Sequence, residues 1–534
     1  MKLKIALLVS AVSLLVLLGL AYLPYRQWTE SGAGDRVWHH ELAADADLTI
    51  GTTSVPADGI VDETFASHLP LVIIDTHGEE IVNYKYFDVD TDSFIYQEGV
   101  DPYVDIQISF IDNSSHVNTL SDSPTMVSDG RIKIRGNSSA SPNRAKKQYL
   151  LKLENTSGEK NSLPVLGMDP SDTWIINGTM TDRSYIRNYI AFNAAGELDP
   201  FTPDIRMCEV VLKQGDQYEY IGLYGVYEKI EQGVGRVDIP PVSNPISISD
   251  RSYILLRDRM ETDGYSMAVW STRNQRSTNW INLEYPSPEN ITDEYWEYIQ
   301  QDIQKIEDAL YSDNQDKFLQ YRSLLDVDSF VDYYIINEFF ANYDAGWNST
   351  YMYKTASGKV AIGPVWDFDG AMDNYEIILL QIDAFAFDEA PWFDRLILDP
   401  YFSEKVVVRY QQLRDGILSS DTISRQIDAA AAFLEYPAKR DMSRWEDLNT
   451  YDLAIIEDSH LEVEIDRNTG TFEGEVQRVK DILVLHGEFM DQSLSAHLSE
   501  NASSMTVSVS LAGWLVIVVF FVSAILIQRL RKGQ

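Results

Sequence analysis

The chain has almost no cysteine. Cys208 is its one thiol, so no disulfide can form within the chain and no cysteine-based metal site is available. Its eight histidines are scattered and include no His-Glu-x-x-His segment, and neither a Gly-x-x-x-x-Gly-Lys-Ser/Thr loop nor a Gly-x-Ser-x-Gly turn occurs. Together these absences disfavour zinc hydrolases, P-loop enzymes and α/β-hydrolases.

Positively charged residues are also scarce. The 43 Lys and Arg face 82 Asp and Glu, which gives a net charge of −39 over 534 residues. Such a chain repels phosphate groups, so we expect no nucleic-acid partner and no general attraction to anionic membranes. We interpret the excess of Asp and Glu as a solvated, negatively charged surface that keeps the protein soluble. Hydrophobic residues make up 45% of the chain, which is enough for a large buried core.

Two long apolar runs stand at the ends of the chain. The first follows two lysines, and it predicts a signal peptide or an uncleaved signal anchor within residues 1–27. The second predicts a transmembrane helix over residues 505–528, with the basic residues 529–534 as a cytoplasmic tail. By the positive-inside rule both ends lie in the cytoplasm, so we expect a cell-membrane protein whose main domain is extracytoplasmic.

Between these runs the sequence predicts an α+β domain. Residues 28–65 are polar with Gly and Pro, as in a linker. Residues 66–290 contain many strand patterns, among them the period-two alternation of Val104–Ile111. Residues 291–498 show mainly helical patterns. This order predicts a two-lobed, protein-kinase-like domain with a β-rich N-terminal lobe, a helical C-terminal lobe and a transmembrane segment at each chain end.

The polar residues best suited to chemistry flank one predicted hairpin. Residues 349–362 read as two short strands around a Ser-Gly turn. Asp344 and Asn348 precede the hairpin, and Asp367 and Asp369 follow it. Because a hairpin folds its ends together, we expect these four side chains at one mouth. Carboxylate and amide oxygens suit Mg²⁺, which completes its coordination with water and substrate phosphates.

Protein kinases place similar parts in the same order: an Asp that orients the acceptor hydroxyl, an Asn, a hairpin and a metal-binding Asp. Here Asp344, Asn348 and Asp367 take those places, although the His-Arg-Asp and Asp-Phe-Gly letters are absent. The alternative, that these polar residues only belong to a loop between strands and form no site, explains the local pattern about equally well. Trp366 and Phe368 favour a site, because apolar neighbours lower the dielectric around a carboxylate.

A basic strand–loop–strand segment precedes this region and is suited to phosphates. Backbone N–H groups, hydroxyls and a cation there can approach phosphate oxygens. The candidates in the first strand and loop are Arg135, Gly136, Ser138 and Ser139. Lys147 or Lys152 on the returning strand would then pair with the phosphates. The alternative is a basic edge hairpin whose lysines discourage aggregation.

Two further segments have possible roles in such a site. Tyr227–Ile230 would serve as the linker that hydrogen-bonds an adenine, and ordinary hairpin packing is the alternative. Arg183 and Arg187 share one face of a helix capped by Asp182, where they could meet a phosphate or the acidic residues of the site. A surface pair is the alternative.

Five motifs in order resemble the spore coat protein H (CotH) kinase family, an atypical protein-kinase-like family. They are Arg135-Gly-Asn-Ser-Ser139 with Lys146-Lys147, Asp182-Arg-Ser-Tyr-Ile-Arg-Asn188, Gly222-Leu-Tyr-Gly-Val-Tyr-Glu-Lys229, Asn337-Glu338 with Asn342-Tyr-Asp344, and Gly363-Pro-Val-Trp-Asp-Phe-Asp369. The resemblance implies ATP with Mg²⁺ or Mn²⁺ and a protein Ser or Thr as acceptor. It implies that Asp344 orients the acceptor hydroxyl, that Asp367 binds the metal and that Asn348 is a second ligand.

The sequence therefore predicts a membrane-anchored kinase that transfers the ATP γ-phosphate to a surface or coat protein. The predicted site residues are Asp344 for catalysis, with Lys147 or Lys152 at the phosphates, and Asn348, Asp367 and Asp369 at the metal. One alternative is a cell-surface structural or adhesion protein on a non-catalytic kinase-like scaffold. Another is metal-dependent hydrolysis, or transfer of another phosphate, at the same carboxylates.

Overall fold

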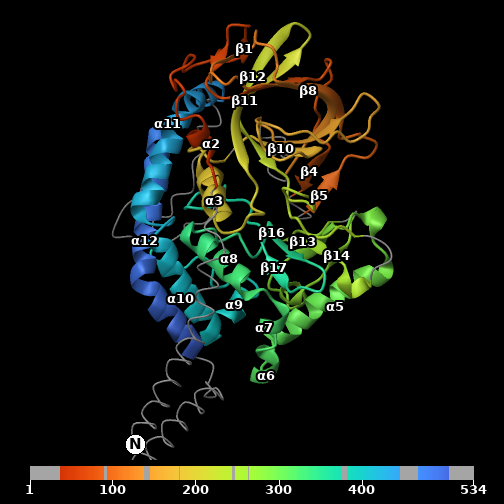
Figure 1. Cartoon of the computed structure of the whole chain (residues 1–534), viewed down its shortest axis with the longest axis vertical. Helices are drawn as coiled ribbons and strands as arrows, with labels where there is room; N and C mark the ends of the chain where they lie inside the picture. Colours follow the sequence, from red (N-terminus) through yellow and green to blue (C-terminus); the bar gives the residue numbers. More distant parts are fainter. Residues whose placement is uncertain are drawn as a thin grey trace, which may run out of the picture.

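The larger sheet curls into a closed barrel (Figure 1). The structure, a computed structural model, describes residues 36–88, 93–136, 145–179, 181–242, 247–261, 264–375, 382–445 and 467–503. Eight strands follow the order β1-β12-β10-β9-β8-β6-β3-β11, and β11 pairs again with β12, which closes every strand except β1 into the barrel. The strands are β1 (Ile60–Val61), β3 (Leu71–Asp75), β6 (Val104–Ile111), β8 (Met126–Ile134), β9 (Tyr149–Glu154), β10 (Thr173–Asn177), β11 (Ile205–Gln214) and β12 (Gln217–Glu228).

Alternating side chains fill the barrel. In β6, the predicted strand Val104–Ile111 is confirmed, and its apolar residues point inward while Asp105 and Gln107 are exposed. The fully buried Trp174 of β10 packs in the same core. In β8, Ile132 and Ile134 face this core, so Lys133 between them faces outward. The period-two pattern therefore sets which side chains of β8 face the solvent.

A second, five-stranded sheet lies beside the barrel, in the order β14-β15-β13-β16-β17. Its strands are β13 (Tyr253–Asp258), β14 (Ser266–Met267), β15 (Trp280–Tyr285), β16 (Thr350–Lys354) and β17 (Val360–Ile362). The predicted hairpin is confirmed as β16–β17, with Met352 opposite Ile362. Since β13 pairs with β16, the sheet joins strands from both sides of residue 290. Two small sheets pair β2 (Ala66–Ser67) with β7 (Asn118–Thr119), and β4 (Lys85–Asp88) with β5 (Ser93–Tyr96).

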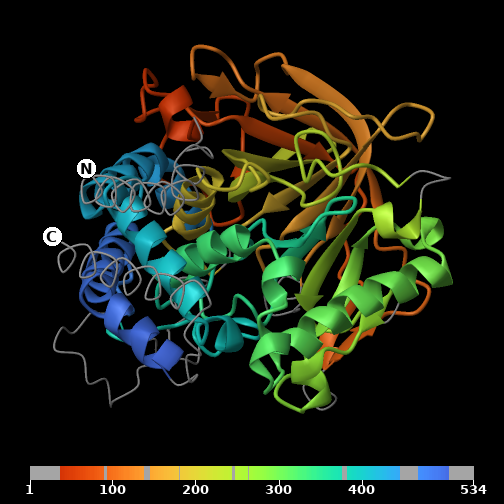
Figure 2. The same ribbon diagram turned by 60° about the horizontal axis from the view of Figure 1, so that its bottom comes forward.

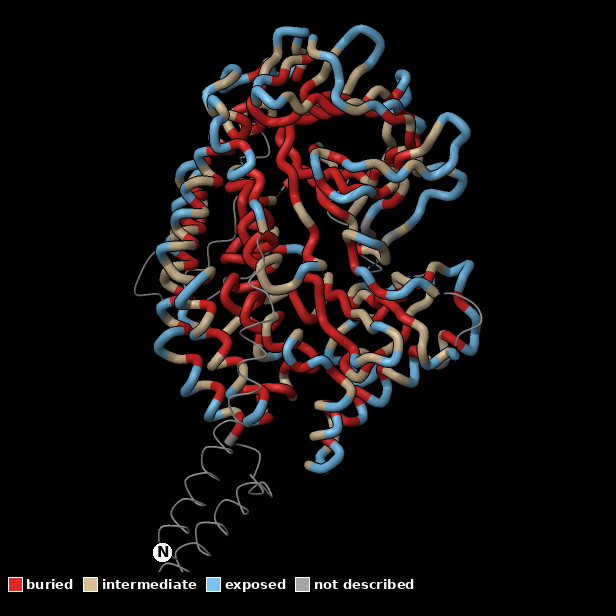
Figure 3. Tube along the Cα trace, in the orientation of Figure 1, coloured by how far each residue is buried: buried red, intermediate tan, exposed pale blue. Residues whose placement is uncertain are grey.

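Helices cover one side of this arrangement, and α11 lies against α12 along it (Figures 1 and 2). The helices are α2 (His39–Leu42), α3 (Arg187–Gly196), α4 (Trp270–Arg273), α5 (Asp293–Leu310), α6 (Gln315–Phe318), α7 (Tyr321–Leu324), α8 (Val327–Phe339), α9 (Phe393–Leu396), α10 (Pro400–Arg414), α11 (Ser420–Arg444) and α12 (Phe472–Ser503). Buried residues run through the barrel strands and into the neighbouring helices (Figure 3).

Two buried ion pairs fasten α11 to the barrel. Arg440 lies 2.5 Å from Glu209 of β11, and both side chains are fully buried. Lys146, just before β9, lies 2.7 Å from Asp441, with side-chain exposures of 2% and 5%. Breaking such a pair leaves an uncompensated buried charge. These contacts hold the C-terminal helices against the N-terminal strands.

The fold prediction was wrong in its membrane-spanning segments. It placed a transmembrane segment at each chain end, within residues 1–27 and over 505–528, and both lie outside the described residues. In the part of the chain that the structure does describe, no helix is both long enough and apolar enough to span a bilayer. What the structure supports is a mixed α+β fold of sheets and helices.

Candidate active site

A cavity of about 500 Å³ opens where the barrel, α3 and the second sheet meet. Its walls include the ends of β8, β10 and β12, the end of β13, and both segments that flank the β16–β17 hairpin. Four carboxylates line it: Asp258, Asp344, Asp367 and Asp369. Asn348 lines it as well, so the structure brings to one cavity the four polar residues that flank the predicted hairpin.

Hydrogen bonds fix the side that precedes the hairpin. The Asn348 side-chain amide donates to the Asp344 carboxylate at 2.7 Å. The Asn348 oxygen accepts a hydrogen bond from the Asn279 amide, which restrains its rotation. The Asn342 amide donates to the backbone carbonyl of Asp367 at 3.2 Å, which links the two flanking segments. Asp344 is therefore held in one orientation at the cavity wall.

Asp367 has an unusual backbone conformation. Its φ of +64° lies in the left-handed region, which few residues other than Gly adopt, and such residues concentrate at functional sites. The Ser349 hydroxyl donates to the Asp367 carboxylate at 3.3 Å. Trp366 and Phe368 on either side are buried, and both rings contact Phe192 of α3. Packing of these neighbours stabilises the strained residue and leaves its carboxylate at the cavity.

Asn188 of α3 holds the second carboxylate of the Asp-Phe-Asp segment. Its side-chain amide donates to the Asp369 carboxylate, and its oxygen accepts the backbone N–H of Phe368 at 2.7 Å. Asn374 extends the support, because its amide donates to the Asp369 carbonyl at 2.7 Å and to the Thr181 carbonyl at 3.0 Å. One buried amide from α3 thus sets the position of both Phe368 and Asp369.

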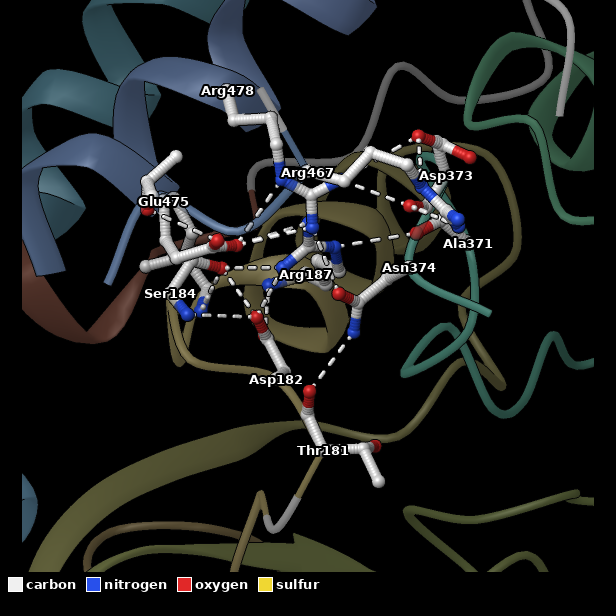
Figure 4. A network of polar contacts seen from close by, with 12 residues as sticks. Thr181, Asp182, Ser184, Arg187, Ala371, Asp373, Asn374, Arg467, Glu475 and Arg478 are labelled. Atoms are coloured by element: carbon white, nitrogen blue, oxygen red, sulfur yellow. Dashed lines mark hydrogen bonds and ion pairs between the residues drawn. The ribbon is translucent and has the colours of Figure 1, made fainter. Parts of the chain in front are cut away.

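Two arginines from the C-terminal part of the chain clamp the loop after Asp369 (Figure 4). Arg467 pairs with Asp373 at 3.0 Å and donates to the Tyr375 carbonyl at 2.9 Å. Arg478 of α12 donates to the Asp373 carbonyl and to the Asn374 side chain, each at 2.9 Å. The far end of the chain therefore shapes the loop beside the cavity.

Arg187 completes this clamp from the first turn of α3 (Figure 4). It pairs with Asp182 at 2.5 Å, lies 3.7 Å from Glu475 of α12, and donates to the Ala371 carbonyl at 3.2 Å. Because α3 begins at Arg187, Arg183 lies outside the helix, and the two arginines do not share a helix face. Arg187 is completely buried, so its role is to support the loop rather than to contact solvent.

Burial raises the pKa values of the cavity carboxylates, and for Asp367, Asp369 and Asp258 a neighbouring carboxylate adds to the effect. Burial by the cavity walls, followed by the charges of Asp344 and Asp258, raises the pKa of Asp367 to about 6. The Asp367 side chain opens onto the cavity, where water screens part of this repulsion. Burial, then the charges of Asp367 and Asp182, raises the pKa of Asp369 well above its usual range. Burial also raises the pKa of Asp344 and of Asp258.

This donor set fits a hard divalent cation that keeps several outer ligands. Within the described ranges, no three His, Cys, Asp or Glu side chains form a group that could hold a metal ion by themselves. Two carboxylates and an amide, from Asp367, Asp369 and Asn348, match the partial protein coordination that Mg²⁺ usually accepts. A cation there would also offset the repulsion that raises the carboxylate pKa values.

The raised pKa of Asp367 predicts a pH-dependent stability without divalent cations. The pKa of Asp367 is near 3.8 in the unfolded chain and about 6 in the folded chain. Protonated Asp367 therefore contributes its full stabilisation below pH 3.8, and this stabilisation is lost as the pH rises through about 6 and the carboxyl group ionises. In EDTA, Asp367→Asn should melt at a higher temperature than the wild type, by a margin that grows from pH 5 to pH 7. Added Mn²⁺ should reverse the order. An equal margin at both pH values would contradict the assigned repulsion.

The predicted phosphate-binding residues divide into three groups. Arg135 and Gly136 line the cavity, and the Arg135 guanidinium lies 5.3 Å from the centre of the Trp366 ring. Ser138 and Ser139 fall outside the described residues. The two predicted lysines do not line the cavity: Lys147 precedes the cavity residue Gln148, and Lys152 is in the middle of β9. Arg135 is therefore the predicted phosphate-binding cation that the structure places at the cavity.

The sequence reasoning missed several cavity residues. Asp258 and Arg259 stand at the end of β13, and Asn188 stands in α3. The apolar run that leads to Asp258 was a local signal for a strand, but nothing local joins that strand to the hairpin. Tyr227 was predicted as part of an adenine linker, and it does line the cavity. Its ring lies 6.1 Å from Trp366, edge to face.

One family model matches most of the chain. The family model described as CotH kinase protein matches residues 132–493, from within β8 to within α12. A search of curated proteins finds no match. The matched segment is well over half of the chain and contains the Asp344–Asp369 region together with the clamp that supports it. The chain therefore belongs to the CotH kinase protein family.

Proposed function

We propose that the protein is a metal-dependent kinase that transfers the γ-phosphate of ATP to Ser or Thr of a protein. The observation that carries this proposal is the convergence of Asp344, Asn348, Asp367 and Asp369 on one cavity beside Arg135. Membership of the CotH kinase protein family supports it. A cavity of about 500 Å³ has the size of many small-molecule sites.

The residues divide the reaction between positioning and charge. Asp344 accepts a hydrogen bond from the acceptor hydroxyl and aims its oxygen at the γ-phosphorus. The new oxygen–phosphorus bond forms as the bond from that phosphorus to the β–γ bridging oxygen breaks, which releases ADP. The hydroxyl proton passes to Asp344, whose pKa is raised by burial, which makes it a stronger base than an exposed carboxylate.

Asn348, Asp367 and Asp369 would hold Mg²⁺ or Mn²⁺, which supplies positive charge to the phosphate oxygens when bound. Arg135 would add a fixed cation on the barrel side of the cavity, with its guanidinium over Trp366. Tyr227, Trp366 and Leu256 provide apolar walls suited to a nucleobase. The extracytoplasmic location expected from the sequence stays a prediction, as does a surface or coat protein as acceptor.

Incubation of the full chain with Mn²⁺, γ-labelled ATP and a generic Ser-containing acceptor protein tests this proposal. We expect label on the acceptor or on the chain itself, with phosphoserine or phosphothreonine located by mass spectrometry. Release of labelled phosphate without any labelled protein would favour metal-dependent hydrolysis. Neither product, together with no ATP-dependent rise in melting temperature, would favour a non-catalytic scaffold on a kinase-like fold.

A further inference from the structure

Beside the cavity, the outside of the barrel carries a cluster of cations that the proposed reaction does not use in full. We name it the basic face and define it as Lys85, Lys133, Arg135 and Lys152, of which Lys85 is buried and the other three are partly exposed. Along β8, Ile132 and Ile134 point into the core, so Lys133 and Arg135 point outward. In β9 the neighbours of Lys152 are buried in the same core, so Lys152 also faces outward.

Tyrosine rings hold these cations in place. The Lys133 and Lys152 ammonium groups each lie 4.9 Å from the centre of the Tyr103 ring. Lys133 also lies 5.3 Å from the ring of Tyr84, which neighbours Lys85 in the segment leading into β4. Cation–π contacts of this kind orient an ammonium group without neutralising its charge. The face thus presents fixed positive charges between aromatic rings.

These charges stand out in a chain with 82 acidic and 43 basic residues. Over the described ranges, Lys133 and Lys152 form no ion pair with a carboxylate, whereas neighbouring Arg131 is paired with Glu154 at 2.6 Å. Burial, and the charges of Lys133 and Arg135, lower the pKa of Lys85 to about 8, while Glu261 and Asp258 act in the opposite direction. An anion on this face would relieve the repulsion between the lysines.

The basic face is continuous with the cavity. Arg135 belongs to both, and Lys133 is two residues before it on the same side of β8, roughly 7 Å away along the strand. Lys152 is opposite Arg131, which is four residues before Arg135 on β8. Lys152 therefore lies roughly 13 Å from Arg135 along the strand direction. An extended acceptor segment that leaves the cavity past Arg135 would therefore reach these lysines about two and four residues beyond Arg135.

Part of the face lies outside the segment shared with the family. The family match begins at residue 132, whereas Lys85, Tyr84 and Tyr103 precede it. Residues that carry out a reaction shared by the whole family are expected inside the matched segment. Residues before it are better suited to a feature of this chain, such as its choice of acceptor.

We propose that the basic face binds an acidic segment of the acceptor protein, rich in Asp or Glu and adjacent to the Ser or Thr that is phosphorylated. The inference rests on the proposed function, because the face gains this meaning from its position beside the cavity. Complementary charge favours such a partner and speeds its encounter with the site, more strongly at low salt. The lysines select the acceptor and take no part in the transfer itself.

Steady-state kinetics with two synthetic peptides test the inference. One peptide has a central Ser with six Glu on either side, which is long enough to reach past Arg135, and the other has Gln in place of each Glu. We expect the wild type to prefer the Glu peptide, through a lower KM, and the preference to fall about tenfold in Lys133→Gln/Lys152→Gln. Lys133→Arg/Lys152→Arg should retain it. Lys160→Gln, which removes a lysine that is 86% exposed at another site, should match the wild type.

The outcomes separate the two proposals. Equal kcat/KM for both peptides would overturn the acidic-segment inference and leave the kinase function standing. If neither peptide is phosphorylated, fluorescence anisotropy of the labelled Glu peptide still decides, because loss of binding in the Lys→Gln variant supports the face and no binding overturns it. A single-stranded oligonucleotide and anionic lipid vesicles are also tested for binding. If either binds as tightly as the Glu peptide and loses binding in the Lys→Gln variant, the face is a non-selective anion surface and the acidic-segment inference is overturned.

Discussion

Asp344→Asn should lower phosphoryl transfer by about a thousandfold while leaving the fold intact. Asn has nearly the same shape and can keep a hydrogen bond with Asn348, which now donates to Asp344 at 2.7 Å. It cannot accept the hydroxyl proton, so kcat should fall while the KM for ATP stays nearly constant. The measurement is steady-state transfer of labelled phosphate at saturating Mn²⁺ and ATP.

Two controls make the Asp344 result specific. Asp216→Asn, in the exposed turn between β11 and β12, should retain full activity and shows the effect of losing an acidic charge elsewhere. Asp216→Asn should melt like the wild type, and Asp344→Asn should match or exceed it, because loss of the Asp344 carboxylate relieves charge repulsion at the site. Full activity of Asp344→Asn would refute its role as the base.

Lys146→Met should destabilise the protein by about 3 to 5 kcal/mol, because it leaves Asp441 charged and buried without its partner. The Lys146 ammonium lies 2.7 Å from Asp441 and donates to the Leu223 carbonyl at 2.8 Å. Asp441 also accepts the Tyr185 hydroxyl at 2.8 Å. We expect a fall of about 3 to 5 °C in melting temperature.

A double variant distinguishes stability from catalysis. Lys146→Met/Asp441→Asn removes both charges and keeps an acceptor for the Tyr185 hydroxyl, so it should recover at least half of the lost stability. Transfer activity per folded molecule should recover with it. A variant that melts normally yet has no activity would show instead that Lys146 acts on the nucleotide.

The position of the candidate site could be predicted because its parts are close in sequence. One short hairpin, β16–β17, brings Asp344 and Asn348 near Asp367 and Asp369. The helix that precedes it and the alternating strand β6 follow equally local patterns. Local periodicity and a tight turn were sufficient for these elements.

The remaining parts depend on contacts between distant segments. Asp258 reaches the cavity because β13 pairs with β16, a contact between residues about ninety positions apart that no local pattern encodes. A run of basic residues likewise does not show which cation faces the cavity. In the structure Arg135 lines it, Lys146 is buried against α11, and Lys152 is on the outer face of the barrel.

The C-terminal clamp was missed for the same reason. Arg467 and Arg478 stand more than ninety residues after the loop that they support, and several of their hydrogen bonds go to backbone carbonyls. Backbone acceptors leave no mark in a sequence, because every residue offers one. Arg187 was noticed, but its buried pairing with Asp182 depends on a helix that begins later than the sequence indicated.

The most direct measurement is electron paramagnetic resonance of Mn²⁺ with ATP and the full chain, in the wild type and in Asp367→Asn. The account predicts a protein-bound Mn²⁺ with hyperfine coupling to phosphorus of the nucleotide, and at least tenfold weaker binding in the variant. It also predicts weaker binding at pH 5.5 than at pH 7.5, because protons compete for Asp367. If Mn²⁺ and ATP stay free in solution with the wild-type chain, or if both bind equally well to Asp367→Asn, the assignment of this cavity is contradicted.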